Sequence, residues 1–341
     1  MSMSYSYSQP VKLFSFNVEK QEDGTNKYNF NENSFPIFYK HSGVITPPLN
    51  LVSGVDKYFD KPYSFNNLCL WDLMAYIHNA VGFSLHHITD HSDIVCYRGF
   101  LKELALLPLG ESLNHTFIAF MYNGIVFIER IEKSTSLINN KTIEKEYMKK
   151  KLSKFCTTKS GIENSNHNST ANLDDNYYVT KTRVFQSENL KIKVMFTGGF
   201  DAINPYRLSE ENNSMEIKVC PGHIAHLFKG SALYKTWAQS FIAGNEVLAA
   251  GIRKNTLVNN IKLLNVSDLE SKLPFLPSKI MEFVGRSLES IVNACRKYPN
   301  KYIIIPQDKF SLSIIDEETT ETINYSRPTS TFLQAFPKET H

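Results

Sequence analysis

Two acidic residues flank a polar segment in the second half of the chain. Asp201 follows the apolar stretch 191–200, and Glu216 lies in the segment 214–219 together with Lys218. Two carboxylates held close together repel each other, and a divalent cation relieves that repulsion. Oxygen ligands suit Mg²⁺ or Mn²⁺, and a nearby lysine can hold a phosphate oxygen as a point charge. The sequence therefore raises the hypothesis of a metal site, with an exposed face of ion pairs as the alternative.

The elements that must position these groups have the pattern of β-strands. Segments 191–197 and 215–220 are rich in Val, Ile, Phe and Met, which favours extended structure. Side chains two residues apart on a strand point to the same face, so Glu216 and Lys218 should share one. If the two segments pair as a hairpin, Asp201 and Glu216 lie on neighbouring strands.

Strands are expected to outnumber helices in the rest of the chain. The strand candidates cover residues 93–100, 115–130, 177–187, 246–253, 301–306 and 310–315, with a hairpin turn at 122–124. The helix candidates cover residues 64–80, 228–244 and 276–298, and apolar residues recur at helical spacing in the second and third. The absence of a regular strand–helix alternation predicts a mixed α+β fold.

One domain of residues 11–341 is expected, preceded by a disordered segment of residues 1–10. The polar stretch 157–176 predicts a mobile insertion within that domain; a domain boundary is the alternative. The 5 cysteines form no CxxC motif, which indicates a reducing compartment. No apolar run has the length of a membrane span, so no membrane partner is expected. A net charge of +3 permits RNA binding without requiring it.

Several segments, in order, resemble the DXO-like family of RNA 5′-end decapping and pyrophosphohydrolase enzymes. They are PLNLVSGVDKYF (48–59), CYRGFLKEL (96–104), MYNGIVFIE (121–129), the Asp201 strand, the EIK segment at 216–218 and WAQSF (237–241). The resemblance covers about residues 10 to 310. It implies a single domain with two packed mixed β-sheets flanked by helices, and a site that uses Mg²⁺ or Mn²⁺.

The resemblance also implies roles for residues that match the motifs. Arg98 would lie near the 5′ phosphates of RNA, with Lys218 and Gln239 as further RNA contacts and catalytic groups. Asp201 and Glu216 would be catalytic and would hold the metal ion, together with the backbone carbonyl of Ile217.

Two acidic positions of the family pattern are replaced. The stretch KKKLS (149–153) places Ser153 where the family has a glutamate, and a one-residue slip would give Leu152 instead. The stretch GFD (199–201) places Gly199 where the family has the first acidic residue of its E-x-D motif. Glycine has no ligand, and a serine hydroxyl is a poor ligand and a poor base. Other carboxylates could be recruited from elsewhere; the candidates are Glu103, Glu129, Glu144 and Glu146.

Two main functions follow from this combination. The first is a protein with weakened or lost catalysis that stabilises the nuclear 5′→3′ exoribonuclease, which implies a nuclear location. The second is an active hydrolase of RNA 5′ ends that uses Asp201, Glu216 and Mg²⁺ or Mn²⁺; removing a water-orienting carboxylate costs roughly 10²–10⁴ in rate. An RNA-binding module without catalysis is a third possibility.

Two other clusters are open to more than one interpretation. The basic run KKKLSK (149–154) could contact RNA phosphates, act in nuclear import, or form a solvated helix face. Two histidine groups have metal-like spacing, but without a third placed ligand they indicate solvated loop residues. These are His86, His87 and His91, and His223 and His226.

Overall fold

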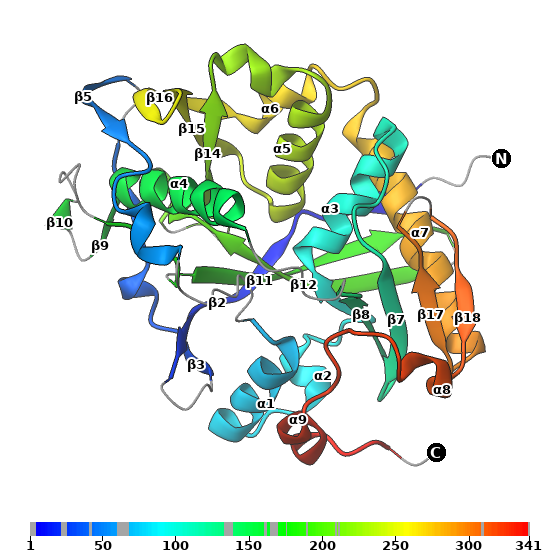
Figure 1. The fold of residues 1–341 in the computed structure, drawn as a ribbon. Helices are drawn as coiled ribbons and strands as arrows, with labels where there is room; N and C mark the ends of the chain where they lie inside the picture. The colour runs from blue at the N-terminus through cyan, green and yellow to red at the C-terminus, as the bar shows by residue number, and fades with distance from the viewer. Residues whose placement is uncertain are drawn as a thin grey trace.

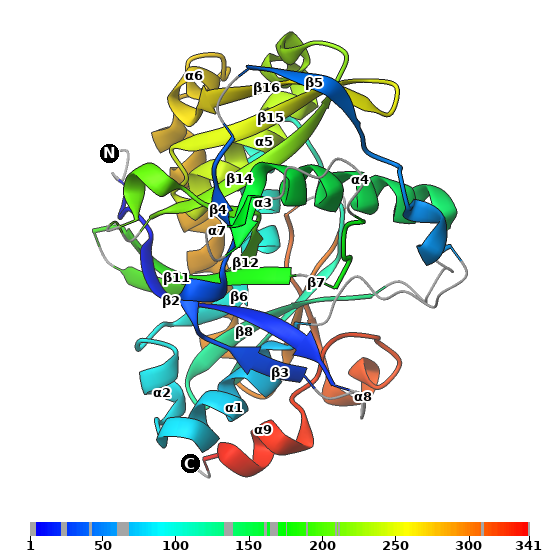
Figure 2. The same ribbon diagram turned by 90° about the vertical axis from the view of Figure 1, so that its left-hand side faces the viewer.

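Two β-sheets, each with parallel and antiparallel pairs, form the frame of the molecule (Figure 1 and Figure 2). The computed structural model describes residues 5–21, 26–40, 43–59, 68–132, 139–159, 162–163, 170–174, 176–188, 190–208, 210, 212–307 and 310–339. The α+β class and the pair of mixed sheets are confirmed.

The first sheet has ten strands within the described residues. Its order is β18 (Ser313–Ile315), β17 (Tyr302–Ile305), β7 (Phe117–Tyr122), β8 (Ile125–Arg130), β6 (Ile94–Tyr97), β12 (Lys191–Phe200), β11 (Asn176–Gln186), β2 (Val11–Lys20) and β3 (Asn26–Asn29), with β1 (Ser6–Tyr7) also along β11. Strands β12, β6 and β8 run parallel to one another, and the other pairs are antiparallel.

The second sheet has eight strands within the same residues. Its order is β10 (Ile162–Glu163), β9 (Thr157–Lys159), β4 (Ile37–Phe38), β13 (Ala202–Ile203), β14 (Ser214–Pro221), β15 (Val247–Lys254), β16 (Leu257–Asn265) and β5 (Gly43–Asn50). The chain passes from the first sheet to the second at Asp201, the one residue between β12 and β13.

Helices cover the faces of both sheets in layers. One face of the first sheet packs against α1 (Leu70–Val81), α2 (Leu85–Ile88) and α9 (Ser330–Ala335). Its other face packs against α3 (Arg98–Leu106), α5 (Gly230–Ala243) and α7 (Pro277–Lys297), in a core that also includes Leu248 and Ala250 of β15. Helices α3 and α5 therefore lie between the two sheets (Figure 1). Two shorter helices are α6 (Val266–Glu270) and α8 (Glu317–Thr320).

Helix α4 (Asn140–Cys156) covers the opposite face of the second sheet. Ala249 faces this helix whereas its neighbours Leu248 and Ala250 face the other core, as the alternation of a strand requires. Leu152 contacts β15 at Gly251, where an added Cβ would lie 2.6 Å from a Leu152 methyl carbon. The glycine thus permits the close approach of α4, which carries Lys149 and Ser153 one helical turn apart to the site.

Most expected elements are present, and the differences have local causes. The expected strand 93–100 is β6 followed at once by α3, so Arg98 begins a helix. The expected helix 64–80 begins at Leu70, and residues 64–67 lie outside the described residues. The turn at 122–124 and the end of α5 at Gly244 are confirmed; Asn123, Gly124 and Gly244 have the positive φ that such positions need.

Two expectations concern flexible segments. Residues 1–10 were expected to be disordered, but Ser6 and Tyr7 pair with β11, and residues 1–4 lie outside the described residues. The mobile insertion expected at 157–176 stays a prediction, because residues 160–161, 164–169 and 175 lie outside the described residues. Its described parts include β9 and β10, and Asn176 begins β11.

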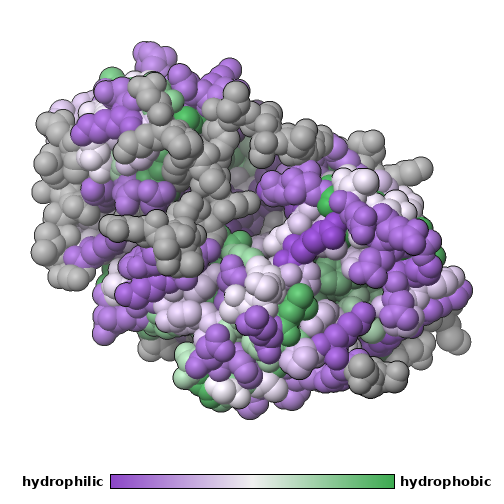
Figure 3. Space-filling model, turned by 60° about the horizontal axis from the view of Figure 1, so that its bottom comes forward, coloured by the Kyte–Doolittle hydropathy of each residue, from purple (hydrophilic) through white to green (hydrophobic). Residues whose placement is uncertain are grey.

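The surface is mainly polar on the face that Figure 3 displays, with apolar residues in small separate groups. Within the described residues, no helix has the length and apolar character needed to cross a membrane. His86, His87, His91, His223 and His226 are exposed, as expected for solvated histidines.

Candidate active site

The candidate site lies where the chain crosses from one sheet to the other. Strand β13 pairs antiparallel with β14, with Ala202 opposite Met215, and the Asp201 amide donates to the Met215 carbonyl at 3.1 Å. The hairpin expected between segments 191–197 and 215–220 does not form, because β14 pairs with the short strand β13 and with β15. Strand β12 belongs to the first sheet, and the chain enters the second sheet only after Asp201.

Glu216 is the centre of a buried network. Its side chain is 1% exposed. Arg98 Nη1 lies 2.8 Å from its Oε1, and Gln239 Nε2 donates to its Oε2 at 2.5 Å. Lys218 Nζ lies 3.6 Å from the same Oε2 and donates to Gln239 Oε1 at 2.5 Å. Glu216 and Lys218 thus share a face of β14, as their spacing predicted, and both oxygens of Glu216 are engaged.

A glycine allows Arg98 to reach this position. Gly198 lies on β12, and a Cβ there would be 2.7 Å from Arg98 Nε and 2.8 Å from Arg98 Cβ. Because atoms cannot approach that closely, any larger residue at 198 would displace the arginine. The position of Arg98 at the start of α3, directly after β6, aims its side chain across β12 toward Glu216.

Asp201 is held by the backbone of the neighbouring strand. Its Oδ2 accepts a hydrogen bond from the Ile217 amide at 2.8 Å, and its Oδ1 lies 3.5 Å from Lys149 Nζ on α4. Asp201 is 8% exposed. Both of its oxygens, like those of Glu216, therefore have a partner within the protein.

The two replaced positions lie beside Asp201. Ser153 Oγ donates to the Asp201 carbonyl at 3.2 Å, and Gly199 is two residues before Asp201 at the end of β12. Leu152, the alternative to Ser153, is 0% exposed and packs in the core under α4. The structure thus brings all eight residues expected at the site into one region, although their chemical roles stay predictions.

The basic groups around Glu216 control its ionisation. Burial alone would raise the pKa of Glu216, but Arg98, Lys218 and Lys149, together with the Gln239 hydrogen bond, lower that pKa to about 2. Burial lowers the pKa of Lys218, while Asp201 raises the pKa of Lys149. Both carboxylates therefore lie next to basic side chains that pair with them.

The residues present do not fit a divalent cation. Within the described residues, no group of three or more His, Cys, Asp or Glu side chains could hold a metal ion. Divalent ions need several free oxygen ligands, whereas the four oxygens of Asp201 and Glu216 all have protein partners. Ser153 and Gly199 add no carboxylate.

The other candidate carboxylates do not complete the cluster, although Glu103 and Glu129 line the neighbouring cavity. Glu103 accepts hydrogen bonds from the amides of Asn114 and His115 and pairs with the His115 ring at 2.5 Å. Glu129 is 3% exposed at the end of β8. Within the described part of the chain, no hydrogen bond or ion pair joins Glu103, Glu129, Glu144 or Glu146 to Asp201 or Glu216. Glu146 acts on the site only through its charge, which raises the pKa of Lys149.

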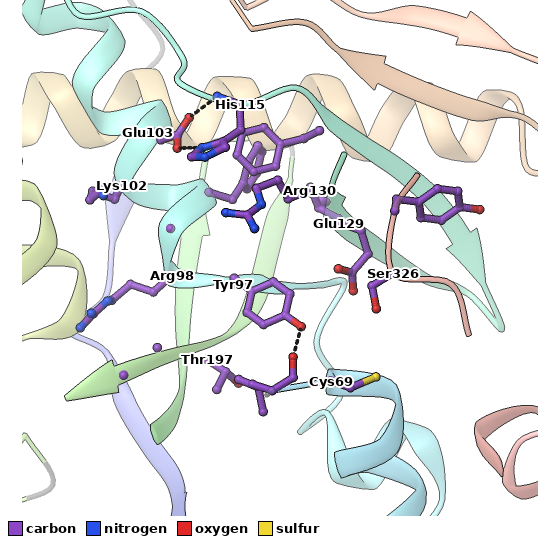
Figure 4. Close-up of a pocket in the computed structure, with 18 of the residues that line it drawn as sticks. Cys69, Tyr97, Arg98, Lys102, Glu103, His115, Glu129, Arg130, Thr197 and Ser326 are labelled. Carbon is purple, nitrogen blue, oxygen red and sulfur yellow. Dashed lines mark hydrogen bonds and ion pairs between the residues drawn. The ribbon is translucent and has the colours of Figure 1, made fainter. Parts of the chain in front are cut away.

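A cavity of about 840 Å³ opens from this network (Figure 4). Arg98, Gly198, Gly199 and Gln239 form its wall next to the site. Basic, acidic and aromatic groups line the rest; they include Tyr97, Lys102, Glu103, His115, Glu129, Arg130, Tyr178, Tyr325 and Ser326. Its size, together with Arg98 and Lys102 in its lining, suits a phosphorylated nucleotide.

Sequence reasoning missed two basic residues of this region. Lys102 lies one turn after Arg98 on α3 and faces the cavity, but reading 93–100 as a strand hid that spacing. Lys149 was interpreted only as part of a basic run. That run is not a solvated helix face: Lys151 is 2% exposed, Lys150 donates to Asn176 Oδ1 at 2.8 Å, and Lys154 donates to the Thr170 carbonyl at 2.8 Å.

Comparisons with known proteins agree with the fold. A family model described as "RAI1 like PD-(D/E)XK nuclease" matches residues 8–333. A decapping nuclease RAI1 from Candida albicans is 23% identical over 301 residues, which are 79% of this chain and 74% of the relative.

Two solved structures have the same fold. Candida albicans Rai1 in complex with pU5-Mn²⁺ has a TM-score of 0.71 and 20% identity, with 93% of this chain and 92% of the other covered. Scheffersomyces stipitis Rai1 in complex with (3′-NADP)⁺ and calcium has a TM-score of 0.74 and 17% identity, with 98% and 97% covered. Divalent cations are thus found in structures of these relatives.

Proposed function

This chain belongs to the RAI1-like PD-(D/E)XK nuclease family, and on that premise we propose that it is a decapping-family protein with weakened or lost catalysis. It would act in RNA 5′-end quality control as a stabilising and activating partner of the nuclear 5′→3′ exoribonuclease. A nuclear location follows from that partner.

One observation carries the loss of catalysis. The two carboxylates that remain, Asp201 and Glu216, are paired with Lys149 and Arg98, while Ser153 and Gly199 stand at the other two acidic positions. Carboxylates in a hydrolytic site of this kind must hold the cation and orient the attacking water. A carboxylate already neutralised by a basic side chain does neither well.

The role as a protein partner is supported by what the chain retains. The family match extends over residues 8–333, and the solved relatives cover more than nine-tenths of the chain. The chain thus keeps the fold of the family but lacks two of its acidic site residues. This combination favours a function that depends on the protein surface, such as binding a partner, over catalysis.

An active hydrolase of RNA 5′ ends is the second candidate. It is favoured by the network of Arg98, Lys218 and Gln239, which is assembled around Glu216 and borders an open cavity. A purely structural role for the protein would not explain why these polar groups are present. The relatives named decapping nucleases support the same alternative.

Two measurements on the purified protein separate these candidates. It is incubated with triphosphorylated or unmethylated-capped RNA and Mn²⁺, and released products are resolved by chromatography. Asp201→Asn serves as the matched variant, since the amide oxygen can still accept from the Ile217 amide. Product release that disappears in this variant would establish the hydrolase and refute the catalytically weakened protein.

The second measurement is copurification of the nuclear 5′→3′ exoribonuclease and its thermal stability with and without this protein. No product release, together with a stabilised exoribonuclease, is the result that we expect. RNA binding in a gel shift without partner binding would instead favour an RNA-binding module.

A further inference from the structure

Lys149 lies close to Asp201, and its charge also acts on Glu216. It projects from α4 toward the crossing of the sheets, and its Nζ lies 3.5 Å from Asp201 Oδ1. The Lys149 side chain is 39% exposed, so it is partly open to solvent while its ammonium group faces Asp201. The docking of Leu152 onto Gly251 fixes the helix that carries it.

The cluster carries an excess of positive charge. Asp201 and Glu216 contribute two negative charges, and Arg98, Lys149 and Lys218 contribute three positive charges, which leaves a formal charge of +1. A divalent cation brought into such a cluster would be repelled, whereas an anion would be attracted.

The cavity beside the cluster has basic groups on the side next to the cluster. Arg98 belongs to both, and Lys102 lines the cavity one helical turn further along α3. Gly199 also lines the cavity and has no side chain, so a ligand can approach the backbone near Asp201. The side of the cavity with Arg98 and Lys102 suits a phosphate group, whereas Glu103, Glu129 and Glu132 line other parts of it.

We propose that the Lys149 ammonium group takes the place of a divalent cation and that the cluster binds the terminal phosphate of a 5′-phosphorylated RNA without metal. This inference deepens the proposed function and rests on it for the choice of RNA as ligand. Arg98 and Lys149 provide the charge that holds the phosphate, and Asp201 and Glu216 hold those two side chains in position.

The first test measures Mn²⁺ binding to the purified protein by electron paramagnetic resonance. The wild type should bind Mn²⁺ only weakly at the cluster, and Lys149→Ala should increase the affinity by at least about tenfold, because it removes a like charge next to Asp201. Lys149→Gln keeps most of the side chain, so an effect that both variants share is due to the lost charge and not to a folding defect of Lys149→Ala. Lys145→Ala is the matched control, since Lys145 is exposed one turn earlier on α4.

The second test measures RNA binding by fluorescence anisotropy in EDTA. Two oligoribonucleotides of one sequence are compared, with a 5′-phosphate or a 5′-hydroxyl group. The wild type should prefer the phosphate, and both Lys149 variants should reduce that preference by about tenfold, the loss expected for one charge-assisted hydrogen bond. Lys145→Ala should not change it.

Either of two results overturns the proposal. One is Mn²⁺ binding by the wild type with an affinity that the Lys149 variants leave unchanged. The other is a phosphate preference that is absent in EDTA or unaffected by the Lys149 variants. Neither assay contains an exoribonuclease or measures hydrolysis, so failure here is distinct from failure of the proposed function.

Discussion

Arg98 Nη1 and Glu216 Oε1 form an ion pair of 2.8 Å in which the arginine is 12% exposed and the glutamate 1%. Removing Arg98 takes away the basic group nearest to the buried Glu216 charge and leaves only the more distant Lys218 and Lys149 to compensate it. We expect Arg98→Gln to lower the free energy of unfolding by about 3 kcal/mol, as measured by urea denaturation.

A double-mutant cycle tests the cause of that loss. Arg98→Gln combined with Glu216→Gln should lose less stability than the sum of the single variants, because neither charge is then stranded. A loss below about 1 kcal/mol for Arg98→Gln, the range of exposed pairs, would contradict the prediction.

Asp201 has a structural role that can be measured separately from any catalytic role. Its Oδ2 accepts the buried Ile217 amide at 2.8 Å. Asp201→Ala leaves this amide without its acceptor and should cost about 2 kcal/mol, whereas Asp201→Asn retains an acceptor and should cost less. Thermal and urea unfolding of both variants measure the difference. Equal losses in the two variants would show that the hydrogen bond is not the cause.

Much of the site could be predicted from sequence because the residues in question have distinctive types. A carboxylate after an apolar strand and an E-x-K segment are visible in the chain, and they indicated Asp201, Glu216 and Lys218. The alternation of strands then placed Glu216 and Lys218 on one face, and their shared contact with Gln239 confirms it.

What could not be predicted depends on contacts between distant segments. Lys149 and Asp201 meet only because α4 packs on the second sheet through Leu152 and Gly251, and no local pattern encodes that docking. Helix α4 itself is rich in lysine and lacks a long apolar stripe, so its role at the site was hidden. Likewise, Arg98 follows a β-branched apolar run that favours a strand, yet tertiary packing of α3 makes it helical.

Two neighbouring glycines on β12 differ in what they can accept. A Cβ at Gly198 would lie 2.7 Å from Arg98 Nε, while a Cβ at Gly199 would meet only the Tyr177 carbonyl, at 3.5 Å. Gly198→Ala should therefore cost about 1–3 kcal/mol through overpacking, and Gly199→Ala should change stability by less than about 1 kcal/mol. Urea unfolding of this matched pair measures both.

The space at Gly199 also permits a gain-of-function experiment. Gly199→Glu and Ser153→Glu, combined with Lys149→Ala, would supply two carboxylates beside Asp201 and remove the competing ammonium group. We expect this triple variant to bind Mn²⁺ more tightly than the wild type, as measured by electron paramagnetic resonance. The same two glutamates beside an intact Lys149 form the control and should bind it more weakly than the triple variant.

Glu129 should make the stability of the protein depend on pH. It is 3% exposed at one end of the cavity near Ser326 (Figure 4), and burial raises its pKa from 4.5 to about 8. Between these two values the unfolded chain releases the Glu129 proton while the folded chain retains it. The unfolded state then binds fewer protons, so the contribution of Glu129 to stability falls as pH rises from 4.5 to 8.

Glu129→Gln removes this titration and keeps the shape of the side chain. The variant should be about as stable as the wild type near pH 4.5 and more stable near pH 8, by an amount on the order of a few kcal/mol. Melting temperatures of both proteins at several pH values between 4.5 and 8.5 measure the effect. Exposed Glu132→Gln is the control and should leave the difference between these pH values unchanged. If Glu129→Gln and the wild type kept a constant difference across this range, Glu129 would have to be ionised in the folded protein, and a cation or hydrogen-bond donor would have to stabilise it there.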